Sequence, residues 1–107
     1  MRIKELLENN SAPIRLGHLC DVKTNFSDAD FWIQRKGSKP TVGSVLEEFS
    51  PENIGIKVKK TDELDPKYLY YFMMRIHGTG HWAANSKGTL NLRHISTGDV
   101  ANLVISR

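Results

Sequence analysis

The sequence contains a single cysteine and no long apolar segment, and each shortage excludes a class of protein. Cys20 has no second cysteine with which to form an internal disulfide or a cysteine-rich zinc site. No apolar run approaches the ~20 residues that a membrane-spanning helix requires. The first ten residues lack the apolar core of a signal peptide. We therefore expect a cytoplasmic protein that does not enter a membrane.

Motifs for catalysis are equally scarce. The glycines are dispersed without a phosphate-binding pattern, and no nucleophile stands beside a matching base. His77 and His81 are four residues apart, but two glycines lie between them and no glutamate follows the first, so we favour polar loop histidines over a metal pair. Asp65 and Lys67 have the spacing of a nuclease fragment, although a helix cap explains Asp65 better. The sequence predicts no catalytic residue, metal or cofactor.

The length of 107 residues and an ordinary composition, 39% hydrophobic and 25% charged, predict one domain spanning 1–107. The net charge of +3 permits binding to nucleic acid but does not require it. Charges of each sign are grouped along the chain, which can give a basic face to a nearly neutral protein. Acidic residues gather at 21–30, 47–48 and 62–65, and basic residues at 35–39, 57–60 and 75–93.

Local patterns predict an α+β fold: a small, twisted, mostly antiparallel or mixed sheet with one main helix at about 66–77. Apolar spacing predicts a short N-terminal helix over 1–9, and Ser96 can open a short C-terminal helical turn. Period-two alternation predicts strands at 31–36, 42–46, 54–59, 90–93 and 103–105. In the third of these, Lys57 and Lys59 form a basic ridge opposite a core-facing side.

The main helix has clear boundary signals. Asp65 can accept hydrogen bonds from the first turn, Pro66 suits the first helical position, and Gly78 fits a left-handed end. An apolar stripe lies between them, at the i, i+3, i+4, i+7 spacing of one helix face. The stripe consists of Leu69, Phe72, Met73 and Ile76.

The segment 79–94 follows this helix and is rich in glycine, histidine and asparagine. We interpret it as a loop held by a rigid support, the kind of segment where recognition residues concentrate. Its amide, hydroxyl and basic side chains can donate to phosphates or to base edges. A plain surface connection is the equal alternative on composition alone.

The order of several motifs resembles target-recognition domains, the DNA-reading modules in specificity subunits of type I restriction–modification enzymes. The motifs are LGHLCDVK from Leu16, NIGIKV from Asn53, LDPKYLYYFM from Leu64, a loop with Gly88, and DVANLVIS from Asp99. The resemblance covers 16–106 and implies the fold and a DNA-reading role. This chain is shorter than such a domain and lacks the long helices that hold methyltransferase subunits, so the resemblance transfers no individual base contact.

We therefore expect a stand-alone, non-enzymatic module that reads double-stranded DNA. The predicted contact residues are basic or carry an amide or imidazole: Gln34, Arg35, Lys36, Lys39, Lys57, Lys59, Asn85, Lys87, Asn91, Arg93 and His94. One alternative is a protein-interaction module that binds methyltransferase or restriction subunits without touching DNA. The third hypothesis is a small metal-dependent nuclease. The sequence leaves the oligomeric state open.

Overall fold

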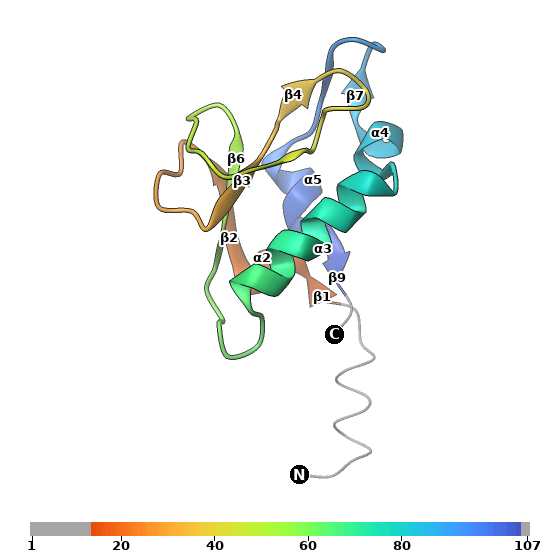
Figure 1. Cartoon of the computed structure of the whole chain (residues 1–107). Helices are drawn as coiled ribbons and strands as arrows, with labels where there is room; N and C mark the ends of the chain where they lie inside the picture. The colour runs from red at the N-terminus through yellow and green to blue at the C-terminus, as the bar shows by residue number, and fades with distance from the viewer. Residues whose placement is uncertain (1–13, 106–107) are drawn as a thin grey trace, which may run out of the picture.

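The computed structural model describes residues 14–105 as an α+β fold in which every strand pairing is antiparallel (Figure 1). The predicted N-terminal helix over 1–9 lies outside the described residues. In chain order the elements are β1 (Ile14–Arg15), α2 (Leu16–Leu19), β2 (Cys20–Thr24), β3 (Phe31–Ile33), β4 (Lys36–Gly37), β5 (Val45–Leu46), β6 (Ile54–Val58), α3 (Pro66–Gly78), α4 (His81–Asn85), β7 (Lys87–Gly88), β8 (Arg93–His94), α5 (Thr97–Ala101) and β9 (Val104–Ile105).

A four-stranded sheet in the order β2-β6-β3-β5 carries most of the core. Its central strand β6 buries Ile54, Ile56 and Val58, as the alternation predicted. Leu69 and Met73 of α3 belong to the same buried cluster, so the helix covers this sheet with its apolar stripe. The predicted helix is confirmed within one residue at its end.

The cap of α3 also follows the prediction at its start. The Asp65 carboxylate accepts a hydrogen bond from the backbone N–H of Lys67 at 3.0 Å, and Pro66 occupies the first helical position. The sequence predicted that Gly78 would end the helix in a left-handed conformation, but Gly78 does not have a positive φ. Gly80 takes that role, with φ of 84°, and α4 begins immediately after it.

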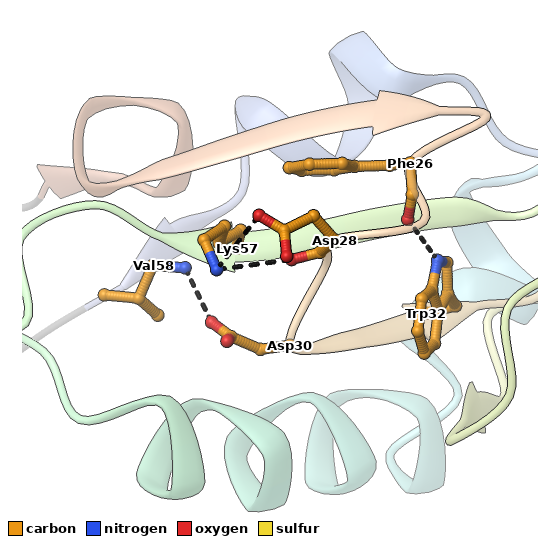
Figure 2. Close-up of polar contacts among 6 residues, drawn as sticks. All are labelled: Phe26, Asp28, Asp30, Trp32, Lys57 and Val58. Carbon is orange, nitrogen blue, oxygen red and sulfur yellow. Dashed lines mark hydrogen bonds and ion pairs between the residues drawn. The ribbon is translucent and has the colours of Figure 1, made fainter.

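Side-chain hydrogen bonds hold the connection between β2 and β3 against β6 and β3 (Figure 2). Asp30 accepts a hydrogen bond from the backbone N–H of Val58 at 2.8 Å, just beyond the last residue that β3 pairs with β6. The indole N–H of Trp32 donates to the carbonyl of Phe26 at 2.9 Å. These bonds hold a turn-rich segment in place without further strand pairing.

The predicted strand over 31–36 is divided between two sheets. Phe31, Trp32 and Ile33 are all buried in β3, so neither side of this strand faces solvent. The backbone of Gln34 then pairs with the turn at 43–44, and the carbonyl of Arg35 accepts from Ile95 at 3.0 Å. The chain thereby leaves the four-stranded sheet before Lys36 begins the next one. The predicted strand over 42–46 shortens to β5 because residues 39–43 form a turn.

A separate three-stranded sheet, in the order β4-β8-β7, lies at the end of the molecule opposite the β1-β9 pair (Figure 1). The segment 79–94 is thus not a plain loop, because it forms α4 and the β7–β8 hairpin. Trp82 of α4 is buried against Gly43, whose φ of 85° and missing side chain leave room for the indole. This contact attaches the hairpin region to the turn after β4.

The two ends of the described chain meet in the β1-β9 pair, where Ile14 lies opposite Ile105. The predicted helical turn is present as α5, and a capping box joins Ser96 and Asp99 at 2.9 and 3.0 Å. Leu103 and Ile105 are buried, as expected for the last strand, while Val104 is exposed.

Candidate nucleic-acid interface

The three-stranded sheet aligns three basic side chains from two distant parts of the chain. His94 on the central strand lies opposite Lys36 on one side and Lys87 on the other. Residues directly opposite one another across antiparallel strands project from the same face, with Cβ atoms about 5 Å apart. All three side chains are exposed. We call Lys36, His94 and Lys87 the basic row.

No carboxylate neighbours the basic row along the chain. The segments that build this sheet, 31–46 and 66–98, contain no aspartate or glutamate. Within the described residues, the side-chain amines of Lys36, Lys39 and Lys87 form no ion pair and no hydrogen bond. Each lysine lies opposite His94, so both amines are placed to contact a bound anion.

The guanidinium of Arg93 links the two strands of the hairpin through hydrogen bonds to Ser86 and Gly88. Its Nε donates to the hydroxyl of Ser86 at 2.6 Å, and one terminal nitrogen donates to the Ser86 carbonyl at 2.6 Å. The other donates to the carbonyl of Gly88 at 3.3 Å. Ser86 is buried, so these bonds satisfy polar groups that water does not reach. The structure therefore gives Arg93 a structural task, and its predicted contact with DNA stays a prediction.

The tip of the hairpin is the segment 89–92, which projects beyond the basic row. The backbone N–H of Thr89 donates to the Leu92 carbonyl at 3.1 Å, and the Thr89 hydroxyl accepts from the Leu92 N–H at 3.2 Å. Asn91 is exposed on this tip. A hollow of about 330 Å³ opens beside it, lined by Lys36, Gly88, Thr89, Leu92, Arg93 and His94.

The strand predicted at 90–93 is wrong for Leu90 and Leu92, which lie in the hairpin tip. Their alternation with polar residues suggested a strand with a core-facing side, but their side chains are 65% and 67% exposed. The signal that could have corrected the interpretation is the polar and glycine context on both sides, which is typical of a hairpin turn.

Three other predicted contact residues serve the local fold. The amide of Gln34 donates to the Lys36 carbonyl at 2.7 Å, and Nε of Arg35 donates to the Glu52 carbonyl at 2.7 Å. The amide of Asn85 donates to the His81 carbonyl within its own helix at 2.7 Å. These bonds fix the orientation of all three side chains, so their part in any contact with DNA is limited to the polar atoms that the bonds leave unused.

Lys57 lies on β6 and Lys59 follows directly after it, and neither joins the basic row. Nζ of Lys57 is 3.6 Å from a carboxylate oxygen of Asp28 (Figure 2), and Nζ of Lys59 is 3.7 Å from Asp21. The predicted basic ridge is therefore neutralised by neighbouring carboxylates. Such exposed pairs contribute little to stability, but they reduce the attraction of this surface for phosphate.

The groups that the sequence raised as possible catalysts have ordinary surroundings. His77 Nε2 is 2.9 Å from the Pro40 carbonyl, and His81 packs edge-on against Trp82. Between residues 14 and 105 no three histidine, cysteine or acidic side chains lie together as a metal site would require. Burial, together with the nearby Asp30, raises the pKa of the Cys20 thiol to about 12, so this buried residue stays protonated at neutral pH.

Two further findings bear on function. None of the helices described between residues 14 and 105 combines the length and the apolar character needed to cross a lipid bilayer. Comparison with known proteins gives no significant match to a family model, to a curated protein or to a solved structure. The resemblance to restriction–modification target-recognition domains stays a prediction.

Proposed function

We propose that this chain is a cytoplasmic DNA-binding module that reads double-stranded DNA and has no catalytic activity or cofactor of its own. The observation that carries the proposal is the basic row, in which Lys36, His94 and Lys87 share an exposed face and neither lysine forms an ion pair within the described residues. The resemblance to target-recognition domains supports the same reading from the motif order.

The proposed interface is smaller than the sequence alone suggested. Lys36, Lys39 and Lys87 would contact phosphates and fix the position of the protein on the duplex. Asn91 and His94 would face the base edges, because asparagine is among the side chains that read the minor groove. The basic row is about 10 Å across, from two cross-strand steps of about 5 Å, so its two lysines can reach phosphates on both sides of a minor groove about 6 Å wide.

Binding is tested with fluorescence anisotropy on duplex DNA as salt is raised. Three phosphate contacts predict a slope of about −3 in log affinity against log salt. Replacing Lys36→Ala and Lys87→Ala together should weaken binding at least tenfold and lower the magnitude of that slope by about 2. The matched control is Lys57→Ala with Lys59→Ala. It removes the same charge from two lysines that are paired with aspartates, and should change affinity less than twofold.

The proposal fails if the wild-type protein shows no salt-sensitive binding to duplex DNA, or if both double variants lose affinity equally. Sequence reading is tested separately by selecting from a pool of randomised duplexes. Asn91→Ala should relax the preference at one base position while leaving the salt slope unchanged. A preference that is identical in the variant would remove Asn91 from the reading surface.

A second candidate function is supported by the outer face of α3. Tyr68, Tyr71 and Met74 are 53%, 57% and 46% exposed there, and residues of these types are enriched at protein interfaces. This face fits a module that binds methyltransferase or restriction subunits without DNA. The test is a pull-down of such subunits from nuclease-treated lysate. Loss of the interaction in the Tyr68→Ser, Tyr71→Ser variant, together with its retention in the Lys36→Ala, Lys87→Ala variant, would favour this function.

A further inference from the structure

The hairpin tip presents two leucines to solvent at the end of the molecule that carries the basic row. Leu90 and Leu92, at 65% and 67%, are the most exposed large apolar residues between positions 14 and 105. Exposing such residues costs solvation free energy that a core position would have avoided. Isolated surface leucines are common, so exposure alone decides nothing, and the surroundings of this pair carry the argument.

The backbone holds the two leucines in place. Lys39 N–H donates to the Leu90 carbonyl at 3.0 Å, which ties the tip to the turn after β4. Thr89 bonds Leu92 through both its N–H and its hydroxyl, at 3.1 and 3.2 Å. Gly88 has φ of 119°, where a side chain would collide with the Leu92 carbonyl oxygen. A tip fixed in this way loses little conformational freedom on binding.

Three lysines lie around the tip, and none of them forms an ion pair among residues 14–105. Lys36 and Lys87 stand in the strands behind it, and Lys39 stands in the turn that bonds it. A partner that satisfies both features has an anionic surface over an apolar interior that a small wedge can enter. Stacked base pairs beneath a phosphate backbone have this character, and proteins that bend DNA commonly insert leucine or similar side chains between base steps from the minor groove.

We propose that Leu90 and Leu92 form a wedge that enters the minor groove, partly unstacks one base step and bends the duplex. This inference rests on the proposed DNA binding and adds how the DNA is deformed. The other surface with anionic groups above an apolar layer is a lipid membrane. Attachment to a membrane grows with the buried apolar area, and a tip with two leucines offers too small an apolar area. One such wedge is enough to enter a single base step.

The experiment uses the whole chain and a short duplex carrying a fluorophore at each end. The probe strand also contains 2-aminopurine, whose fluorescence rises when it is unstacked. We expect the wild-type protein to shorten the distance between the fluorophores and to raise the 2-aminopurine signal. It should also bind a duplex with one central mismatch about tenfold more tightly than the matched duplex, because a mismatched base pair is easier to unstack.

The variant Leu90→Ser with Leu92→Ser should bind both duplexes equally, without bending either, and should keep the salt slope of the wild type. Val104→Ser is the matched control, since Val104 is 52% exposed on β9 at the opposite end of the molecule (Figure 1). This control should bend DNA and prefer the mismatch as the wild type does.

The outcomes separate the two proposals. Salt-sensitive binding of the wild type without bending or mismatch preference overturns the wedge and leaves DNA binding intact. Absence of salt-sensitive binding to any duplex overturns both. Co-sedimentation with vesicles of anionic lipid that requires Leu90 and Leu92, without unstacking of DNA, would assign the tip to a lipid surface and also overturn the wedge.

Discussion

Lysines lie at both the four-stranded sheet and the three-stranded sheet, but their surroundings differ. On the four-stranded sheet, Lys57 and Lys59 stand 3.6 and 3.7 Å from aspartates. On the three-stranded sheet, Lys36 and Lys87 stand on either side of His94 in segments without an acidic residue. A lysine-rich strand therefore says little about a binding role until the positions of the carboxylates are known.

The two sheets also differ in how they use apolar residues. The four-stranded sheet buries Ile54 and Ile56 completely beneath α3, while the hairpin exposes Leu90 and Leu92. One region places its apolar side chains where they stabilise the fold. The other keeps them on the surface, where they are available to a partner. Matched pairs of substitutions test this contrast.

The largest effect is expected from matched leucine substitutions in the two regions. Leu69 is fully buried in α3, so Leu69→Ala leaves a cavity and should lower the free energy of unfolding by about 2–5 kcal/mol. Leu92→Ala removes an exposed side chain and should change it by less than about 0.5 kcal/mol. Urea unfolding followed by circular dichroism measures both. Comparable losses in the two variants would mean that the hairpin tip is part of the core.

An intermediate effect is expected from two glycines. Gly88→Ala places a side chain at φ of 119° against the Leu92 carbonyl, which should destabilise the protein by about 1–3 kcal/mol. Gly78→Ala lies in α3 with open space around it, and alanine there should stabilise by about 0.5–1 kcal/mol. Thermal unfolding distinguishes the opposite signs. A neutral Gly88→Ala would show that the hairpin bends freely, which contradicts a rigid tip.

The smallest effect on the free energy of unfolding is expected from the two pairs of lysine substitutions. Lys57→Ala with Lys59→Ala removes two exposed ion pairs and should lower the free energy of unfolding by about 0–1 kcal/mol per pair. Lys36→Ala with Lys87→Ala removes exposed lysines that form no ion pair within the described residues, and should change the free energy of unfolding by less than about 0.5 kcal/mol. Unfolding at low salt enlarges the difference, and high salt should abolish it. Destabilisation by the second pair of substitutions would reveal a missed partner for these lysines.

Local signals in the sequence determine α3 and β6 well. Asp65 and Pro66 define the start of the helix, and the spacing from Leu69 to Ile76 defines its buried side. The alternation in β6 identifies its buried residues correctly. These features depend on neighbours within a few residues, so single-sequence patterns contain them.

The three-stranded sheet could not be found in this way. Each of its strands has two residues, too few for periodicity, and β4 pairs with a strand more than fifty positions away. The alternation of Leu90 and Leu92 is that of a buried strand, although the segment turns back on itself at the surface. The structural task of Arg93 depends on Ser86 being buried, which only the folded chain reveals.

The hydrogen-bond fork of Arg93 has a consequence for engineering the molecule. Because Arg93 reaches back to Ser86 and Gly88, the hairpin is closed at its base independently of what the tip contains. Positions 90, 91 and 92 can therefore be exchanged as a cassette, since Leu90 and Leu92 join the hydrogen bonds of the tip only through backbone atoms. A library randomised at these three positions would vary the contact surface on a constant scaffold, with Thr89 kept because its hydroxyl accepts from the backbone N–H at position 92.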